Sequence, residues 1–383
     1  MPECGVAVKL TVSVCSCDVC WVFANLEGAA VGGGAAEQRA RCTCPFPLPL
    51  AMPFQTKLCE MLGIEHPVVM GGLTGVGTPE LAAAVSNAGG CGFVCAHQSG
   101  SPETCVEWLR QMDELTDKPW GVNLTILREF TQAEGYCDAI IEAQCKIIET
   151  AGRNPAEFLP RFKEGIPGCI VIHKCTSIRH SISAVRHGAD IISLDGFECA
   201  GHPGEDDVGN FVLQAAGANK LSVPYICSGG VTTGSQLAAA LALGACGVNV
   251  GTAFCASSEC IWPQVFKDRI IESDETDTYM SMRPLKNSSR IFMNKTAEAL
   301  AEIERDNWNN MTYEKVQSLM AGTRGRQAER DGDADAGTWA AGQGIGLIED
   351  TVPCQVIMDR MIAEAEETIK ERLSSLLTPA ARM

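Results

Sequence analysis

The feature that most constrains the fold of this chain is an eightfold alternation of short apolar runs with longer helix-like segments. The apolar runs lie at residues 67–70, 91–95, 120–126, 146–150, 169–173, 191–194, 223–228 and 247–250. Strands that are nearly all apolar are covered on both faces, as in a parallel sheet whose strands are joined by helices. Eight such units predict an α/β fold, a TIM (β/α)8 barrel, with a doubly wound open sheet as the alternative.

The segments between the runs carry helix signals at their ends. The expected helices cover residues 79–88, 102–114, 133–143, 155–163, 177–187, 209–218 and 235–243. Thr78 and Ser101 precede two of them as N-cap candidates, and Gly188 and Gly244 follow two others as stop signals. Residues 71–77 are rich in glycine, but they lack the G-x-G-x-x-G spacing of dinucleotide-binding folds.

Residues 1–51 differ from the repeating pattern. They hold six of the twenty cysteines, no histidine and a proline-rich end, so we expect a poorly ordered, cysteine-rich extension rather than a zinc site. Residues 52–383 are then expected to form one barrel domain, with helical additions from about residue 257 onward.

Within these additions, residues 289–295 and 297–305 predict helices, and residues 322–341 predict a polar, glycine-rich loop. Residues 353–377 predict one long helix with an apolar face. That face is expected to lie in the core or in a homodimer contact, and it consists of Ile357, Met361, Ala365, Ile369 and Leu373.

Charge and cysteine content narrow the class of protein. The formal net charge is −17, which argues against a broad basic surface for nucleic acid or an anionic membrane. Residues 237–256 are nearly all apolar, but they are rich in Ala and Gly and are broken by Asn249 and Thr252, so no membrane span is predicted. The fourteen cysteines from Cys59 onward are scattered, many within apolar runs, as reduced and buried thiols are. We therefore expect a cytoplasmic protein.

Glycines follow the last two predicted strands. Ser228, Gly229 and Gly230 end the seventh strand, and Gly251 and Thr252 end the eighth. In α/β barrels these two loops commonly bind a phosphate, because bare glycine amides cradle its oxygens. The sequence therefore predicts a phosphate site at this edge of the barrel.

Other strand ends supply polar groups to the same mouth. Asn123 lies on the third strand, Lys174 follows the fifth, and Asp195 and His202 follow the sixth. A phosphate site beside an amide, a lysine and a histidine suits a phosphorylated cofactor. A Cys199–His202 nucleophilic dyad is a weaker alternative. The other histidines, His66, His97, His173, His180 and His187, are interpreted as structural or exposed.

Five stretches together resemble the nitronate monooxygenase (2-nitropropane dioxygenase) superfamily of FMN-dependent TIM-barrel enzymes. They are HPVVMGG, WGVNLTIL, DGFECAGHPGEDD, CSGGVTTGSQLAAALALGACGVNVGT and AGQGIGLI. The resemblance runs from about Phe54 to the C-terminal helix. It is strongest to the NADH:quinone reductase branch, through the HKC run at residues 173–175 and through ECAGH at 198–202, where nitronate monooxygenases more often show an EAGGH-like form.

The resemblance implies where the cofactor binds. It implies an FMN phosphate on Gly229, Gly230, Gly251 and Thr252, with Ser228 beside them. Around the flavin it implies Met70, Gly71, Gly72, Asn123 and Lys174, and it makes His202 the active-site histidine that acts as a base or positions the substrate. No metal is implied.

The function expected from this resemblance is FMN-dependent NAD(P)H:quinone oxidoreductase, with NAD(P)H reaching the flavin from the open mouth. The alternatives are a nitronate monooxygenase that oxidises alkyl nitronates with O2, an FMN-dependent enoyl-thioester reductase, and a flavin- or phosphate-binding barrel without turnover. The expected partners are small molecules, a quinone or an alkyl nitronate, and neither nucleic acid nor membrane. The acidic run at residues 204–207 has no assigned role.

Overall fold

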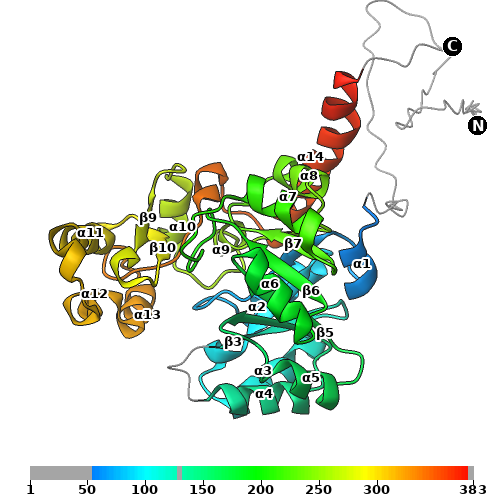
Figure 1. Ribbon diagram of the computed structural model, residues 1–383, viewed down its shortest axis with the longest axis horizontal. Helices are drawn as coiled ribbons and strands as arrows, with labels where there is room; N and C mark the ends of the chain where they lie inside the picture. The colour runs from blue at the N-terminus through cyan, green and yellow to red at the C-terminus, as the bar shows by residue number, and fades with distance from the viewer. Residues whose placement is uncertain (1–53, 127–131, 378–383) are drawn as a thin grey trace, which may run out of the picture. The chain divides into compact units, whose positions relative to one another are not determined.

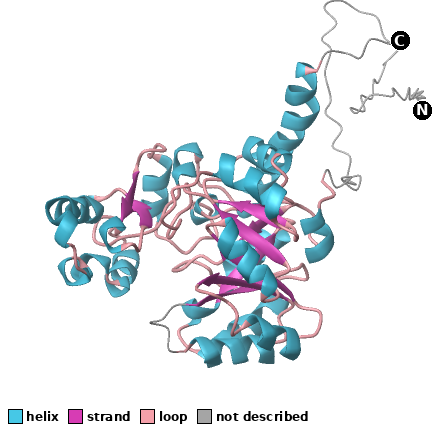
Figure 2. Cartoon of the chain, in the orientation of Figure 1, coloured by secondary structure: helices cyan, strands magenta, loops and turns pink. Residues whose placement is uncertain are grey.

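Eight parallel strands close into a barrel in the computed structural model of the chain, which describes residues 54–126 and 132–377 (Figures 1 and 2). The strands are β1 (Val68–Met70), β2 (Cys91–Cys95), β3 (Gly121–Ile126), β4 (Ile147–Gly152), β5 (Ile170–Cys175), β6 (Ile191–Asp195), β7 (Tyr225–Ser228) and β8 (Val248–Asn249). Each strand pairs with the next, and β8 returns to β1 through the pairs Val68–Val248 and Val69–Asn249. The TIM barrel is confirmed, and the open sheet is excluded.

Helices accompany the barrel strands, and most of them cover the outside of the barrel (Figure 1). They are α1 (Lys57–Leu62), α2 (Pro79–Asn87), α3 (Pro102–Leu115), α4 (Ala133–Glu142), α5 (Leu159–Gly165), α6 (Ile178–Arg186), α7 (Asn210–Lys220), α8 (Gly234–Ala242) and the short α9 (Thr252–Cys255). The hydroxyls of Thr78, Ser101 and Ser177 accept backbone N–H bonds at the starts of α2, α3 and α6, as N-caps do. Helix α1 was not predicted from the sequence, and α5 begins four residues later than predicted.

The inside of the barrel changes from apolar to polar along the strands. One buried cluster near the strand starts contains Val69, Phe93, Ile147, Ile172 and Ile191, and Leu58 of α1 joins it. Because side chains two residues apart share a face of a strand, the next inward layer is read directly from the sequence. That layer is polar, and it consists of Asn123, Glu149, Lys174, Ser193 and Asn249.

The segment after α9 forms a lobe beside the barrel, which we call the cap (residues 257–341; Figure 1). It contains α10 (Gln264–Ile271), the antiparallel hairpin β9 (Thr278–Ser281) and β10 (Ser289–Phe292), α11 (Lys295–Asn307), α12 (Gln317–Met320) and α13 (Gly322–Asp331). The expected helix at 297–305 is confirmed as part of α11.

Two predictions for the cap are wrong. Residues 289–292 form strand β10 rather than a helix, because they pair with residues 278–281. Residues 322–331 form helix α13 rather than a loop, with Ala328 buried and Gly332 in a left-handed conformation at its end. Both corrections depend on contacts between distant parts of the chain, which a local pattern does not contain.

The C-terminal helix α14 (Cys354–Glu367) packs on the barrel, but it is shorter than predicted. Of the predicted core face, Met361 and Ala365 are buried and Ile357 is partly buried against the same core. The chain continues as a π-helical turn (Thr368–Leu373) and a 3₁₀ turn (Ser374–Leu376). There Ile369 and Leu373 are 40% and 43% exposed, so their prediction as core residues is wrong.

The described residues bear on the cysteines and on membrane-spanning helices, but not on the N-terminal extension. The extension at residues 1–51 lies outside them, and so does the question of zinc there. All fourteen cysteines from Cys59 onward are free, and all but Cys246 are buried, as predicted. Among the described residues, no helix has the length and apolar character needed to cross a membrane.

Candidate functional site

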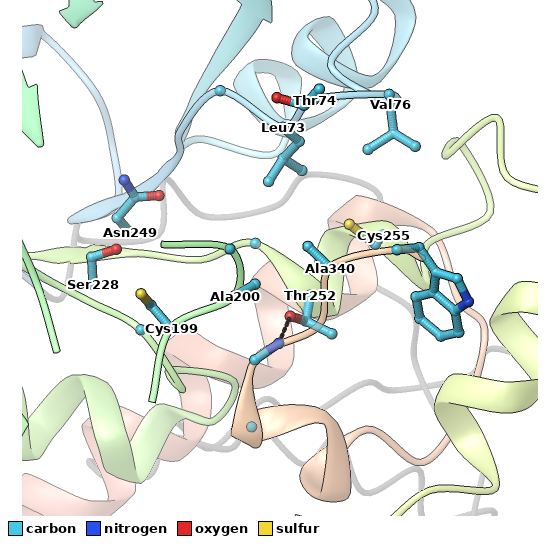
Figure 3. A pocket seen from close by; sticks show the side chains of 18 of the residues that line it. Leu73, Thr74, Val76, Cys199, Ala200, Ser228, Asn249, Thr252, Cys255 and Ala340 are labelled. Atoms are coloured by element: carbon cyan, nitrogen blue, oxygen red, sulfur yellow. Dashed lines mark hydrogen bonds between the residues drawn. The ribbon is translucent and has the colours of Figure 1, made fainter. Parts of the chain in front are cut away.

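A cavity of about 370 Å³ lies over the carboxyl ends of the barrel strands, a size typical of small-molecule sites (Figure 3). The loops after β1, β6, β7 and β8 line it from the barrel, and residues of α13 and of the segment 338–344 line it from the cap. Seven predicted site residues line this cavity, and they are Gly72, Lys174, Ser228, Gly229, Gly230, Gly251 and Thr252.

Beneath the cavity, the fully buried Glu149 of β4 receives hydrogen bonds from several elements. Its Oε1 accepts from the side chain of Asn123 at 2.7 Å and from the backbone N–H of Gly72 at 2.8 Å. Its Oε2 accepts from the side chain of Asn249 at 3.3 Å. Lys174 Nζ lies 3.6 Å from Oε1. One carboxylate thus joins β3, β5, β8 and the loop after β1.

Asn249 extends this network to the other side of the barrel. Its Oδ1 accepts the Gly71 N–H at 2.9 Å, and its Nδ2 also donates to Ser193 Oγ at 3.2 Å. Ser193 Oγ in turn donates to Asp195 Oδ1 at 3.1 Å. A buried polar network is stabilising when its members are satisfied, and these contacts satisfy it.

The floor of the cavity holds a cation, Lys174, near two carboxylates, Glu149 and Asp195. Burial alone lowers the pKa of Lys174, but the carboxylates of Glu149 and Asp195 outweigh that effect and raise the pKa above its ordinary value. Burial raises the pKa of Asp195, while Lys174 and the hydroxyl of Ser228 oppose this shift. Lys174 is therefore a permanent cation that lines the cavity at neutral pH.

Gly71 and Gly72 leave room for this network. A Cβ on Gly71 would lie 2.5 Å from Glu149 Oε2, and a Cβ on Gly72 would lie 2.1 Å from Asn123 Cγ. Any larger residue would displace the buried amide or carboxylate. Met70 is fully buried beside them, so Met70, Gly71 and Asn123 lie under the cavity and do not line it.

The loops after β7 and β8 present free backbone donors to the cavity. Within the described residues, no protein acceptor takes the N–H groups of Gly229, Gly230 or Gly251. Gly229 and Gly230 have φ values of +97° and +71°, which L side chains rarely adopt. Thr252 Oγ1 accepts the Gly342 N–H at 3.1 Å, which leaves its hydroxyl proton free to donate (Figure 3). Such a set of donors is suited to the oxygens of an anion.

These donors and Lys174 fit the two ends of an FMN. Unsatisfied amides are the chemistry that a phosphate needs, and a lysine cation is the chemistry that favours negative charge on a flavin ring. When bound, FMN supplies a group that accepts a hydride from one substrate and passes electrons to another. In this chain Gly229, Gly230, Gly251 and Thr252 would hold its phosphate, and Lys174 would stabilise the charge of its ring.

His202 is not among the residues that line the cavity. It is exposed, and its Nδ1 donates to the backbone carbonyl of Ser288 in the cap at 2.9 Å. Its neighbour Gly201 does line the cavity, so the histidine stands next to the rim. Among the other histidines, His173 is buried against Thr150, and its burial lowers its pKa to about 4.

Cys199 lines the cavity as a neutral thiol. It is 7% exposed, and burial raises its pKa far above the ordinary value, with Asp195 adding to the effect. The thiolate is the nucleophilic form of cysteine, and this environment disfavours it. The geometry therefore gives no support to a Cys199–His202 dyad.

Sequence reasoning missed three members of the floor, namely Glu149, Ser193 and Asn249. Each is a polar residue within an otherwise apolar strand, in the runs IIET, IISLD and GVNV. A buried polar side chain needs partners, so a polar residue at an inward-facing position was the available signal. It also missed the cap's contribution to the wall, which includes Trp262 and Trp339.

Comparison with known proteins settles the family. The model of the nitronate monooxygenase family matches residues 55–154 and 136–364, most of the chain. The chain belongs to the nitronate monooxygenase family. The enzymes of this family are flavin-dependent oxidoreductases, so the resemblance expected from the motifs is confirmed.

Relatives of this nitronate monooxygenase family member carry different names. A probable nitronate monooxygenase from Staphylococcus aureus (strain MRSA252) is 26% identical over 82% of this chain and 99% of its own length. A (3aS,4S,5R,7aS)-5-hydroxy-7a-methyl-1-oxo-octahydro-1H-indene-4-carboxyl-CoA dehydrogenase from Rhodococcus jostii (strain RHA1) is 27% identical, over 82% of this chain and 97% of its own.

Two solved structures share the fold. FabK from Thermotoga maritima superposes with a TM-score of 0.77 and 32% identity, covering 85% of this chain and all of its own. A nitroalkane oxidase from Streptomyces ansochromogenes has a TM-score of 0.69 at 22% identity, over 82% of this chain and 99% of its own, and shows likeness of fold.

Proposed function

We propose that this family member is an FMN-dependent NAD(P)H:quinone oxidoreductase. The observation that carries the proposal is the single cavity that joins three free glycine N–H groups to the cation Lys174 over a buried floor. The glycine donors suit a phosphate, and the lysine suits a flavin ring. In this reaction NAD(P)H gives a hydride to the flavin, and the quinone then takes two electrons and two protons to become a quinol.

The walls above the floor support flat substrates. Backbone atoms of Gly201, Gly342 and Gly344 line the cavity, and so does Trp339, in the same segment as the last two glycines. Glycine backbone leaves a narrow, flat surface, and such surfaces suit planar rings such as nicotinamide and quinone. His202 stands at the rim, where a solvent-facing imidazole can supply a proton to the acceptor oxygen.

A second candidate is an oxidoreductase that acts on an acyl-CoA thioester. It is favoured by the name of the Rhodococcus relative, a carboxyl-CoA dehydrogenase. The match covers 97% of the relative's length. The same floor would serve this reaction, because the flavin carries the electrons in both cases and the thioester can be their donor or their acceptor. Oxidation of alkyl nitronates by O2 is a third activity of the family, and the test below includes it.

The experiment compares acceptors on one FMN-loaded preparation. The flavin is reduced anaerobically with NADH or NADPH, and the rate of its reoxidation is measured with benzoquinone and with an α,β-unsaturated acyl-CoA. A separate reaction with propionate 3-nitronate in air follows oxygen consumption. A His202→Gln variant is carried through all reactions to show which of them depends on the rim histidine.

The proposal predicts rapid reoxidation by benzoquinone and slow oxygen uptake with the nitronate. Faster reoxidation by the acyl-CoA than by the quinone would replace the proposal with the second candidate. Nitronate-dependent oxygen uptake without reduction by either nicotinamide would refute both.

A further inference from the structure

The acidic run Gly204–Asp207, which the sequence left without a role, lies in the loop between β6 and α7 and contacts the cap. Glu205 binds Ser288 twice: its Oε1 accepts the Ser288 backbone N–H at 2.8 Å, and its Oε2 accepts the Ser288 hydroxyl at 2.7 Å. Ser288 is 2% exposed, so these two donors have been removed from water. The Glu205 carboxylate therefore fixes the position of the Ser288 peptide.

The same residue, Ser288, holds the rim histidine. Its backbone carbonyl accepts a hydrogen bond from His202 Nδ1 at 2.9 Å. A carbonyl oxygen only accepts hydrogen bonds, so in the neutral ring the proton lies on Nδ1 and the lone pair on Nε2. The contact selects one of the two tautomers and fixes the ring.

Other contacts also join the β6–α7 loop to the cap, beside the hydrogen bond between His202 and Ser288. Gly201 and Arg290 exchange backbone hydrogen bonds of 3.0 and 2.6 Å, which form an isolated antiparallel bridge. Arg290 also donates to the carbonyl of Phe197 at 2.8 Å, and its guanidinium lies over the Phe197 ring. These contacts keep the loop against β10, so Glu205 and His202 reach the same serine from one side.

We propose that Glu205 is a positioning residue that, through Ser288, holds His202 in the Nδ1–H tautomer with Nε2 free at the rim of the cavity. For the reaction this inference rests on the proposed function, in which His202 meets the acceptor. Nε2 is then the atom that takes up a proton from solvent and passes it to the acceptor oxygen, while the Nδ1–H stays on the Ser288 carbonyl. Glu205 does not touch the substrate.

The test reads the tautomer directly. Long-range ¹H–¹⁵N spectra of the ¹⁵N-labelled, FMN-loaded full chain distinguish a protonated Nδ1 from a protonated Nε2. The chain has six histidines, and loss of one set of signals in His202→Gln assigns the residue. The variants are Glu205→Ala, Glu205→Gln and Ser288→Ala, with the rate of quinol formation measured on each.

Asp207→Asn is the matched control. Asp207 lies in the same loop and pairs through both oxygens with Arg283 of the cap, at 2.9 and 3.0 Å, but it does not contact Ser288. The control therefore removes a loop-to-cap ion pair while leaving the contacts of His202 in place. Melting temperatures of all variants separate a loss of folding from a loss of positioning.

The inference predicts the Nδ1–H tautomer in the wild type and in Asp207→Asn, and a mixture in Glu205→Ala. Reoxidation by the quinone should slow about 10-fold in Glu205→Ala, part of the 10²–10⁴ that a positioned acid or base contributes. Glu205→Gln keeps one acceptor oxygen and should lie between, as should Ser288→Ala, which keeps the N–H bond.

An unchanged His202 tautomer in folded Glu205→Ala would overturn the inference, and so would an equal change in Asp207→Asn. A changed tautomer with an unchanged rate in both Glu205→Ala and His202→Gln would uphold the positioning and refute the role of His202 in the proposed reaction. The two failures are thereby distinguished.

Discussion

At the residue scale, Glu149 connects more of the candidate site than any residue that the motifs indicated. Its carboxylate is fully buried, yet it meets a cation and three hydrogen-bond donors from four parts of the barrel. A buried charge is tolerated only with such partners, because its transfer out of water is otherwise costly. Glu149 therefore holds Lys174 as a cation and fixes the loop after β1 at the same time.

Replacing Glu149 by Ala should strongly destabilise the protein. The change leaves Lys174 without its nearest carboxylate and leaves the donors of Asn123 and Gly72 unsatisfied, so we expect a loss of about 3–5 kcal/mol in the free energy of unfolding. Urea denaturation measures this loss. Glu142→Ala, which removes an exposed ion pair with Arg110, is the control and should change little. Equal effects of the two variants would refute the role of Glu149.

His173 makes stability depend on pH. Burial lowers its pKa to about 4, while in the unfolded chain a histidine titrates near 6.5. Below pH 6.5 the unfolded state binds a proton at His173 that the native state does not bind. The contribution of His173 to the free energy of unfolding is therefore complete above pH 6.5 and is lost as pH falls towards 4. From pH 7 to pH 5, the wild type should lose about 2 kcal/mol more than His173→Asn. Parallel pH curves for the two proteins would contradict this.

At the scale of secondary structure, the strands of the barrel were predictable, whereas in the cap the helix at 297–305 was predicted and the segments at 289–292 and 322–331 were not. Buried parallel strands appear in the sequence as apolar runs, so all eight were found, although the strand that carries Lys174 runs two residues further than predicted. Residues 289–292 and 322–331 were misassigned because their conformation depends on pairing and packing with distant segments. Local propensity does not contain that information.

In the candidate site, too, residues at strand ends could be predicted, and contacts between distant parts of the chain could not. The glycines after β7 and β8 were expected at one mouth because strand ends meet there in a parallel barrel, and they line one cavity. The contacts of Glu149 were not found, because four strands must close before its partners come within reach. The role of Glu205 was equally hidden, since Ser288 lies 83 residues away in the chain.

The loop that follows β8 offers a clean test of the phosphate site. Among the described residues, the one atom within 4 Å of a Cβ on Gly251 would be Leu73 Cδ2, at 3.3 Å, so Gly251→Ala should fold normally. Gly251→Val should invade the space of the phosphate and raise the dissociation constant for FMN at least about 10-fold, equivalent to about 1.4 kcal/mol. Titration of the apoprotein with FMN, followed by flavin fluorescence, measures this. Unchanged affinity in Gly251→Val would remove Gly251 from the site.

Gly230 is a poorer target for the same test. Its φ of +71° strains any L residue, and a Cβ would lie 2.9 Å from Glu198 Cβ. A loss of FMN in a Gly230 variant would therefore not distinguish a damaged fold from a blocked phosphate site.

At the scale of the whole molecule, the end of the chain suggests self-association. Beyond α14 the side chains of Ile369, Leu373 and Leu376 are 40%, 43% and 75% exposed, and this segment extends past α8 (Figure 1). The spacing of these three residues places their side chains along one side of the segment that follows α14. Glu366 pairs with Lys370 of the same copy, but Glu367 precedes this stripe and Arg372 lies within it, so two antiparallel copies would bring these opposite charges together. We propose a homodimer through this stripe.

Leu373→Glu should abolish this association. Two copies would then place carboxylates opposite each other in the contact, and sedimentation velocity should show a monomer where the wild type is a dimer. Phe211→Glu is the control, since Phe211 is also exposed, at 80%, but lies on α7. A wild type that sediments as a monomer would refute the dimer, and dissociation by the Phe211 variant alone would move the contact to α7.

In the proposed reaction, one cavity brings NAD(P)H to an FMN held by this barrel. The most direct test is anaerobic mixing of the FMN-loaded protein with NADH or NADPH, with the flavin absorbance followed over time. We expect saturable loss of the oxidised flavin band with at least one nicotinamide, slowed in Gly251→Val by loss of cofactor. A protein that binds FMN stoichiometrically, yet keeps an unchanged flavin spectrum with both nicotinamides, would contradict it.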